Sequence, residues 1–389
     1  MFCSMSDNSF KKKFFIITTI AQSLFFFKGQ PRMWKEKFDV CAISSDHLKL
    51  KDFANAEGIR YKLIPMKREI SIFSDFVCLF RFILLFIKER PHIVHGNTPK
   101  ASMLSMVAAW LTRRPVRIYM CHGLRYETTT GVLLKVLKTM EWISCHCATQ
   151  VIGVSQGVVD RLVSDGLCGK DKINVVGYGT AGGIDLNRFS VNAISSNFNV
   201  RKSLNIPCDA FVFSFVGRIV KDKGVNELVA AFEKLSKIRT NIYLILIGPE
   251  EDADPISVDA KNIVNSSNRI FLLGRKDDVR PYVSACNALV LPSYREGLGQ
   301  VILEANALKV PCIASDIIGP RDVISPLVNG ELVQTRSADA LYDKMKEWVD
   351  EPERVNHMAM LSRDFVTERF EQETVRNAYY TEYCKLAKL

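Results

Sequence analysis

Short apolar runs alternate with longer segments of helical periodicity along almost the whole chain. The apolar, β-branched runs of the first half lie at 14–20, 38–44, 60–64, 92–95, 116–120, 150–154 and 173–176. Those of the second half lie at 211–216, 242–247, 270–273, 288–291 and 312–314. Helical patterns separate them, for example at 100–111, 133–147, 225–237, 278–285 and 301–308. Continuous apolar strands between helices predict parallel sheets covered on both faces.

The pattern occurs twice, so it predicts an α/β protein of two doubly wound parallel-sheet domains. A chain of 389 residues is long enough for two cores of ordinary size. Periodicity is lost between 185 and 207, where Asn, Ser and Arg dominate. We therefore predict a first domain at 1–195 and a second at 196–371. A C-terminal helix at about 372–389 is expected to pack back on the first domain.

Two apolar stretches could be mistaken for membrane segments. Three lysines at 11–13 precede the apolar stretch 14–27, as in a signal peptide, but polar residues interrupt the run and no small-residue cleavage site follows. We interpret it as a buried strand and a loop. The stretch 70–87 carries Asp75 and Arg81, which disfavours a spanning helix. It predicts a Phe-rich helix in the core or on the surface, where it could contact a membrane face.

Charge is distributed unevenly over the chain. The net charge is +10, but residues 1–190 hold 27 Lys and Arg against 15 Asp and Glu, while the remainder holds 25 against 27. A basic first half predicts an anionic partner, either nucleic acid or an anionic membrane surface. The eleven cysteines show no repeated spacing, which fits a reducing cytosol. Cys145-His146-Cys147 has no second pair that would complete a metal site.

The most informative motif runs from Glu296 to Glu304, where two carboxylates bracket the glycines at 297 and 299. An apolar strand leads into it and a helix follows, and a helix start with free N–H groups binds anions. The carboxylates would stand ~12 Å apart if the segment were fully helical. Paired glycosidase carboxylates work at roughly 5–9.5 Å. The spacing instead suits a diphosphate ligand with hydroxyls at both ends, such as a nucleotide-sugar.

A second motif, 217–224, connects a buried strand to a helix and contains Arg218 and Lys223. Two fixed cations at a strand's carboxyl end can neutralise a diphosphate leaving group, although a solvated loop is an equally good reading of this segment alone. Such cations make a divalent ion unnecessary. The acidic pair Asp252 and Asp254 lies in a polar loop, and we interpret it as solvent-exposed rather than metal-binding.

Several polar residues follow strands of the first half. Gly29 follows the first strand through a loop, His95 and Asn97 follow the fourth, and His122 follows the fifth. Ligands of open parallel sheets bind outside the carboxyl ends of the strands. We therefore expect these residues, with those of the second half, to line a cleft between two facing domains.

The combined pattern of Gly217-Arg218, Lys223-Gly224, the segment 296–304 and Gly183-Ile184-Asp185 resembles glycosyltransferase family 4. That family has the fold called GT-B, two Rossmann-like domains that face each other across a cleft. The resemblance covers nearly the whole chain. The first half is similar to bacterial capsule, O-antigen and N-glycan transferases of the diacetylbacillosamine-linked N-acetylgalactosaminyltransferase type, through the segments 27–30, 95–100 and 122–125.

The resemblance implies a role for each matching residue. His122 and Glu296 would act at the transferred sugar, and His95 and Asn97 would contact the acceptor. Arg218 and Lys223 would hold the donor diphosphate, and Glu304 would bind the ribose hydroxyls. The remaining donor contacts would come from the first-domain loop and from the motif's turn: Gly29, Gly297, Leu298, Gly299, Gln300 and Val301. One departure is that Gly29 stands alone where many relatives carry two adjacent glycines.

The function implied is a retaining, metal-independent transfer of a HexNAc or hexose from a UDP-sugar, with no cofactor. The acceptor would be a polyprenyl-diphosphate-linked saccharide used for surface polysaccharide or glycan assembly. The basic, Phe-rich first domain would contact the anionic cytoplasmic face of the bacterial inner membrane as a peripheral protein.

Two other functions remain open at this point. One is a GT-B epimerase or a transferase that modifies a small metabolite. The other is a non-catalytic basic protein that binds membrane or nucleic acid. The latter gives no reason for Arg218, Lys223, Glu296 and Glu304 to occur together. It also predicts aromatic residues interleaved with Lys and Arg, whereas the Phe cluster lies in an apolar helix. We expect no nucleic-acid partner.

Overall fold

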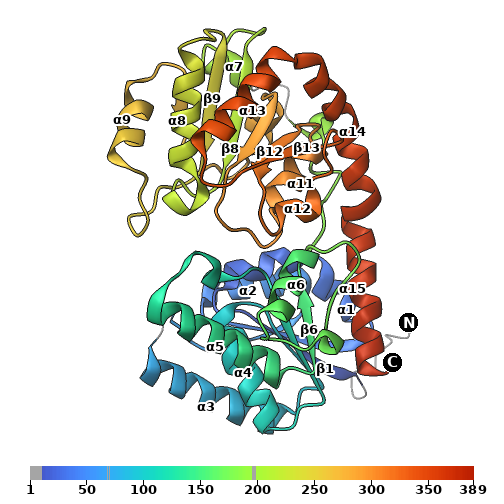
Figure 1. Ribbon diagram of the computed structural model, residues 1–389. Coiled ribbons are helices and arrows are strands. Elements are labelled where there is room, and N and C mark those ends of the chain that lie inside the picture. Colours follow the sequence, from blue (N-terminus) through green and yellow to red (C-terminus); the bar gives the residue numbers. More distant parts are fainter. Residues whose placement is uncertain (1–10, 68, 70, 195–198) are drawn as a thin grey trace, which may run out of the picture. The chain divides into compact units, whose positions relative to one another are not determined.

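The computed structural model describes residues 11–389, except 68, 70 and 195–198, and divides into two compact units (Figure 1). The first unit comprises Met1–Gly182 together with Glu373–Leu389, and the second comprises Gly183–Gln372. Each unit contains one sheet in which all strand pairs are parallel.

The sheet of the first unit has seven strands in the order β3-β2-β1-β4-β5-β6-β7. The order reverses direction at β1, so the carboxyl ends of β1 and β4 flank a topological switch point. The strands are β1 (Lys12–Ile17), β2 (Phe38–Ser44), β3 (Arg60–Leu63), β4 (Ile93–Gly96), β5 (Val116–Cys121), β6 (Gln150–Gly153) and β7 (Ile173–Val175).

The central strands of this sheet are apolar on both faces because helices cover both sides. The side chains from Phe14 to Ile17 in β1 are fully buried. Phe14 stacks on Trp34 at a centroid distance of 4.8 Å, and Trp34 meets the ring of Tyr383 edge-on at 5.1 Å. The C-terminal helix is therefore part of the first unit's core.

The helices of the first unit connect successive strands. Asp46 caps the first turn of α2 and Ser155 that of α6, each by accepting a backbone N–H in the first turn. The helices are α1 (Gln30–Trp34), α2 (His47–Glu57), α3 (Ile72–Glu89), α4 (Pro99–Leu111), α5 (Gly131–Cys147), α6 (Gln156–Ser164) and α15 (Gln372–Ala387), with the 3₁₀ turns η2 (Ala21–Phe27), η3 (Arg125–Thr128) and η4 (Lys170–Lys172).

The sheet of the second unit has six strands in the order β10-β9-β8-β11-β12-β13. They are β8 (Phe211–Val216), β9 (Ile242–Ile247), β10 (Ile270–Leu272), β11 (Ala288–Leu291), β12 (Cys312–Ser315) and β13 (Gly330–Val333). The helices are α7 (Val200–Ser203), α8 (Val225–Ser236), α9 (Val258–Ser266), α10 (Arg280–Ser284), α11 (Gln300–Ala307), α12 (Pro320–Val323), α13 (Ala338–Asp350) and α14 (Pro352–Phe370), with the 3₁₀ turns η5 (Val191–Ala193) and η6 (Lys221–Lys223).

Each strand that the apolar pattern predicts is present, with ends shifted by three residues at most. The largest shift is in β1, which ends at Ile17 because Thr18 and Thr19 begin the loop to η2. The pattern misses β13, whose four residues include Gly330 and Glu331. Glu331 is tolerated in this strand because Trp348 Nε1 donates to its carboxylate at 2.6 Å and Arg354 Nη2 donates at 2.7 Å.

The boundary between the units lies at 182/183 rather than at the predicted 195/196, which falls among residues outside the described part of the chain. The segment after Gly183 belongs to the second unit because α14 holds it. The guanidinium of Arg363 donates to the carbonyl oxygens of Leu186 and Phe189 at 2.9 and 2.6 Å. Residues Glu373–Leu389 group with the first unit.

The Phe-rich stretch near residue 70 forms α3, a helix on the outer side of the first unit (Figure 1). Its first predicted residue, Ile70, lies outside the described residues. Within the described part of the chain, no helix combines the length and apolar character needed to cross a bilayer. Asp75 is buried in α3, where Lys100 of α4 pairs with it at 2.8 Å.

Candidate functional site

Three loops meet at the carboxyl edge of the second unit's sheet. The loop 217–224 follows β8, and its Ile219 N–H donates to the carbonyl of Pro249, after β9, at 2.8 Å. Gly248 has φ +151°, and a Cβ there would overlap with the carbonyl of Gly217. A Cβ on Gly224, with φ +69°, would overlap with the carbonyl of Pro292, after β11. These glycines permit backbone contact between the loops.

The predicted pair Lys223 and Glu296 comes together at this edge. Lys223 Nζ lies 2.5 Å from Glu296 Oε1, and the two side chains are only 18% and 15% exposed. A second ion pair joins the same loops, with Arg295 Nε 2.9 Å from Asp222 Oδ2. The loops after β8 and β11 therefore hold one cation and one carboxylate in a fixed relation.

Arg218 occupies a different environment in the same loop. Its Nη1 lies 2.6 Å from Glu251 Oε2, with 41% and 38% of the two side chains exposed. An ion pair this exposed contributes only about 0.2–1 kcal/mol. The guanidinium can therefore exchange Glu251 for another anion at small cost.

Glu304 lies on α11, within the motif that the sequence singled out. Its carboxyl group is partly buried and has neither a hydrogen bond nor an ion pair among the described residues. Burial raises the pKa of Glu304 to about 7, and the charge of Arg188 opposes that shift. A partly buried carboxyl without a partner is suited to accept hydrogen bonds from hydroxyl groups of a ligand.

The turn before α11 is shaped by glycines. Gly299 is the N-cap with φ +89°, and Gln300 begins the helix. Gly319, with φ +92°, packs so closely that a Cβ would lie 2.9 Å from the nitrogen of Leu298. Because Gly297 to Gly299 form a turn, the segment from Glu296 to Glu304 is not fully helical as the ~12 Å spacing assumed.

The N-terminal turn of α11 is formed by Gln300 and Val301, with Leu298 buried just before it. The first turn of a helix leaves N–H groups without intrahelical acceptors and carries a partial positive charge. The Gln300 side chain donates to the carbonyl of Gly183 at 3.4 Å. The predicted phosphate contacts at 297–301 are thus located at a helix start.

Four side chains that support this edge were not predicted. Tyr294 donates its hydroxyl to Glu227 Oε1 at 2.6 Å, and the guanidinium of Arg336 lies 4.5 Å from the Tyr294 ring centroid. Asp254 Oδ2 accepts the N–H of Asp222 at 2.8 Å, so this carboxylate supports the loop 217–224. Glu227 lies in α8 and the other three lie in different loops, so no sequence spacing could reveal them. Asp254 is half-buried, unlike the exposed residue that the sequence suggested. Asp252 is exposed, as the sequence suggested.

In the first unit, His122 follows β5 directly. Its ring stacks on Phe26 at a centroid distance of 5.7 Å and meets Phe27 edge-on at 6.1 Å. Burial lowers the pKa of His122 to about 4, so the ring is neutral at pH 7. Neither ring nitrogen has a hydrogen-bond partner among the described residues. The neutral His122 ring can therefore donate one hydrogen bond to a ligand through one nitrogen and accept one through the other.

His95 and Asn97 are buried rather than open to a ligand. Asn97 Nδ2 lies 2.8 Å from His95 Nδ1, and the Tyr383 hydroxyl lies 3.1 Å from His95 Nε2. Both are at most 2% exposed, and burial lowers the pKa of His95 to about 3. This burial argues against direct acceptor contact. The contacts favour a structural role in which His95 joins β4 to α15.

Gly29 is also explained by contacts within the first unit. Its N–H donates to Glu57 Oε1 at 2.7 Å, and Arg376 Nη2 donates to the carbonyl of Lys28 at 2.5 Å. The φ of Gly29 is +84°, and a Cβ would overlap with the Arg376 guanidinium. The glycine is required by this close approach, and its N–H already has an acceptor, so the predicted donor contact through that group has no support here.

No group of three or more His, Cys, Asp or Glu side chains is placed to hold a metal ion within the described residues. The groups available at the edge of the second unit's sheet are the cations Arg218 and Lys223, the carboxyl groups of Glu296 and Glu304, and the N-terminal turn of α11.

Two doubly wound domains, with cations and acidic side chains at the carboxyl edge of the second, are the architecture of the GT-B fold. The family described as "Glycosyltransferase Family 4" matches residues 32–181, and "Glycosyl transferases group 1" matches residues 196–364. The chain belongs to this family of glycosyltransferases, as the resemblance of its motifs indicated.

Two curated relatives are similar over most of their length. The capsular polysaccharide biosynthesis glycosyltransferase CapM of Staphylococcus aureus is 34% identical over 94% of both chains. The UDP-Gal:alpha-D-GlcNAc-diphosphoundecaprenol alpha-1,3-galactosyltransferase of Escherichia coli is 27% identical over 81% of both chains. Among solved structures, Anabaena HepE in complex with UDP and glucose matches with a TM-score of 0.79 and 17% identity, covering 96% of this chain and all of that one. This last likeness shows the fold.

Proposed function

We propose that this glycosyltransferase moves a HexNAc or hexose from a UDP-sugar to a polyprenyl-diphosphate-linked saccharide, with retention of anomeric configuration, during assembly of a bacterial surface polysaccharide. The observation that carries the donor assignment is Glu304, a partly buried carboxyl without a partner, on the helix that starts beside the Lys223–Glu296 pair. Two similar proteins support this choice of substrates. The Escherichia coli relative is named for a UDP-Gal donor and a diphosphoundecaprenol-linked acceptor, and HepE holds UDP.

Each donor residue has a role that its environment suits. Glu304 accepts hydrogen bonds from the ribose hydroxyls. Lys223 and Arg218 neutralise the diphosphate, and the start of α11 at Leu298–Val301 adds N–H donors. Glu296, held in place by Lys223, contacts hydroxyls of the donor sugar.

The transfer step follows a front-face course. The acceptor hydroxyl oxygen bonds to the anomeric carbon while the bond from that carbon to the β-phosphate oxygen breaks. The electron pair of the broken bond stays on UDP, and the departing phosphate oxygen takes the hydroxyl proton. Lys223 and Arg218 stabilise the charge that develops on the phosphate. His122, neutral at pH 7, donates a hydrogen bond to the transferred sugar.

The two cations take the place that a divalent metal holds in other transferases, so we propose that transfer needs no metal ion. Activity measured with and without EDTA tests this point. A requirement for Mg²⁺ or Mn²⁺ would contradict it.

The acceptor carries a lipid, so we propose that the enzyme works at the cytoplasmic face of the inner membrane as a peripheral protein. The basic first domain is suited to that surface, because each Lys or Arg near an anionic bilayer contributes ~1 kcal/mol of attraction.

The experiment is a transfer assay with a panel of UDP-, GDP- and ADP-sugars and an undecaprenyl-diphosphate-linked GlcNAc acceptor, with the product's anomeric configuration read by NMR. We expect transfer from a UDP-sugar with retention. The Lys223→Ala variant is expected to lose at least about a hundredfold in kcat/KM, since a hydrogen-bonded charge on the leaving group is removed. Lys221→Ala, an exposed cation of the same turn, is the matched control and should stay within about twofold.

Other outcomes point to the other functions. Epimerisation or hydrolysis of the UDP-sugar without transfer would indicate an epimerase, and transfer to small metabolites alone would indicate a soluble-substrate enzyme. Undiminished transfer by a Lys223→Ala/Glu296→Ala variant would remove the catalytic assignment.

A further inference from the structure

Helix α3 presents an unbroken stripe of large apolar side chains to solvent. Five of them, at 73, 76, 80, 84 and 87, follow each other at spacings of three and four residues, so they share one face of the helix. With Ile72 before them, the exposed side chains of the stripe are Ile72 (86% exposed), Phe73 (83%), Phe76 (69%), Phe80 (55%), Leu84 (51%) and Ile87 (56%). A surface stripe of this size indicates an interaction site.

The opposite face of α3 is well packed, so the exposure is not a sign of a loose helix. Phe82 and Phe86 are fully buried, and Phe86 lies 6.2 Å from the ring of Phe15 in β1. Near the N-terminal end, the buried pair Asp75–Lys100 ties α3 to α4. The stripe is thus a fixed surface on a rigid element.

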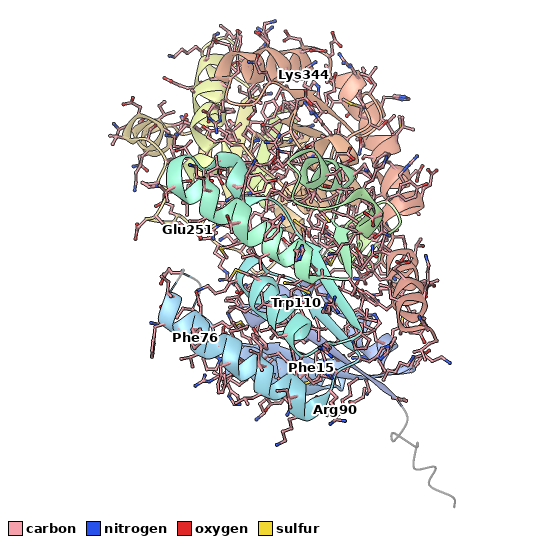
Figure 2. All side chains as sticks on the ribbon, turned by 60° about the horizontal axis from the view of Figure 1, so that its bottom comes forward. Phe15, Phe76, Arg90, Trp110, Glu251 and Lys344 are labelled. Carbon is pink, nitrogen blue, oxygen red and sulfur yellow. The ribbon has the colours of Figure 1, made fainter. Side chains whose placement is uncertain are left out.

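The charges around the stripe have one sign. The two acidic residues of α3 are both neutralised, Asp75 by Lys100 and Glu89 by Lys13 and Lys62. The exposed cations Arg81, Lys88 and Arg90 form no ion pair with a carboxylate among the described residues. Figure 2 shows Phe76 near one end of α3 and Arg90 at the other.

We propose that α3 is the membrane-docking surface of this enzyme, and that it lies in the headgroup region of an anionic bilayer with the stripe Ile72–Ile87 toward the acyl chains. An apolar face combined with unpaired cations is the pattern of interfacial helices. The cations attract anionic headgroups, and the Phe side chains enter the bilayer. Four charged residues in α3 prevent it from spanning.

The charge pattern favours a bilayer over a second copy of the chain. A copy docked on the same face would bring two sets of unpaired cations together, since no free carboxylate of α3 could face them. Anionic lipid headgroups complement those cations directly. Burial lowers the pKa of Arg114, and the nearby charge of Arg90 lowers it further, so positive charge is concentrated where α3 and α4 end.

This inference deepens the proposed function by naming the surface that reaches the lipid-linked acceptor. Its test is flotation of the full chain with vesicles of phosphatidylglycerol and phosphatidylcholine, or of phosphatidylcholine alone. We expect binding to the anionic vesicles that weakens with salt. Phe73→Ser/Phe76→Ser/Phe80→Ser should reduce the partition coefficient about a hundredfold or more, because each buried Phe contributes about tenfold or more. Arg81→Gln/Lys88→Gln should remove most of the salt dependence.

The matched control is Val258→Ser/Met360→Ser, which replaces two exposed apolar side chains (75% and 63%) of the second unit. It should bind vesicles as the unaltered chain does. All variants change exposed positions, and an unchanged Tm verifies that they fold. Hydrogen exchange on vesicles should protect α3 peptides but not α9 peptides.

Several results would overturn the proposal. The first is vesicle binding by the triple Phe variant that equals binding by the unaltered chain, and the second is no protection of α3 from hydrogen exchange on vesicles. The third is a dimer that the unaltered chain forms without lipid and that the triple variant does not form. This last result would show that the stripe is a self-association surface. Transfer to an acceptor with a short, water-soluble prenyl chain separates the two hypotheses. The triple variant should retain that activity and lose transfer in vesicles. If the unaltered chain transfers sugar to neither acceptor, the proposed function is wrong. The flotation assay does not depend on transfer, so it still tests whether α3 binds the membrane.

Discussion

Glu296 and Glu304 belong to one motif but lie in different electrostatic surroundings. Glu296 is held by Lys223 at 2.5 Å, whereas Glu304 has no partner and its pKa is raised to about 7. A carboxylate fixed by a cation can orient a sugar, while a free carboxyl can bind a diol. The environment therefore divides two identical side chains between two roles.

The first prediction concerns Glu304→Gln. The amide keeps the size of the side chain but removes the charge-assisted hydrogen bonds to the ribose, which are worth about 1.5–3 kcal/mol. UDP affinity measured by calorimetry should fall about tenfold to a hundredfold. Glu353→Gln, an exposed glutamate of α14, should change nothing. Unaltered UDP binding by Glu304→Gln would place the ribose elsewhere.

The raised pKa of Glu304 gives a second prediction, for pH. Below about pH 7 this carboxyl is protonated and accepts hydrogen bonds less well. UDP affinity should therefore rise more steeply between pH 6 and 8 in the unaltered chain than in Glu304→Gln. Titration of UDP itself affects both proteins equally, so subtracting one pH profile from the other cancels it. Parallel pH profiles would show that Glu304 does not contact the nucleotide.

The third prediction concerns Glu251, which pairs with Arg218 before any donor binds. Glu251→Gln leaves the guanidinium without this competitor. Because the pair is exposed and worth about 0.2–1 kcal/mol, UDP affinity should rise by about 1.5-fold to fivefold. Arg218→Ala should lower it. A loss of affinity in Glu251→Gln would mean that Glu251 itself supports the site.

At the scale of elements, glycines decide how closely loops and helices approach. Gly29 is the N-cap of α1 with φ +84°, and it lies between the Glu57 carboxylate and the Arg376 guanidinium of α15. The sequence suggested a glycine made for a ligand, but the chain itself occupies that space. A short helix near the amino end is in this way fastened to the C-terminal helix.

The fourth prediction is that Gly29→Ala destabilises the fold by about 2 kcal/mol or more, because a left-handed φ costs an alanine about 1–2 kcal/mol and Arg376 must move. Gly131→Ala is the matched control, since Gly131 has φ +65° and open space around it. The two losses of stability are compared by urea unfolding. Adding Arg376→Ala should restore part of the stability that Gly29→Ala loses. If Gly29→Ala and Gly131→Ala lose equal stability, the Arg376 side chain moves aside without a measurable cost.

At the scale of the whole molecule, buried titratable groups link stability to pH. Glu141 of α5 is 5% exposed and accepts the hydroxyl of Tyr119. Burial raises the pKa of Glu141 to about 7, so the folded state binds more protons than the unfolded chain between pH 4.5 and 7. Stability from this group is therefore lost as pH rises through that window. The lowered pKa values of His95 and His122 act in the opposite sense below pH 6.5.

The fifth prediction isolates Glu141. Relative to Glu141→Gln, the free energy of unfolding of the unaltered chain should fall by about 2 kcal/mol between pH 5 and 8. Urea unfolding at each pH provides the measurement. Tyr119→Phe should steepen the dependence, because the Tyr119 hydrogen bond lowers the pKa of Glu141. If the difference in unfolding free energy between the unaltered chain and Glu141→Gln stays constant from pH 5 to 8, Glu141 is ionised in the folded state over that whole range.

Much of the fold could be predicted because strands and helices leave local periodic patterns. The strands from Phe211 to Leu291 in the second unit follow directly from apolar runs. β13 could not be predicted, since Glu331 is acceptable in a strand only through Trp348 and Arg354, which are distant in sequence. That the segment after Gly183 groups with the second unit could not be predicted either, because Arg363 binds it from another helix.

For the candidate site, the sequence by itself determined the chemical types and their order: Arg218 and Lys223 after one strand, and Glu296 and Glu304 around a glycine turn before a helix. Those are local features of a strand, a loop and a helix start. Only the tertiary structure decided the partners. It paired Lys223 with Glu296, gave Arg218 to Glu251, left Glu304 without a partner and buried His95 beneath α15. Partners depend on which loops meet at a sheet edge, and that is settled by packing between residues far apart in the chain.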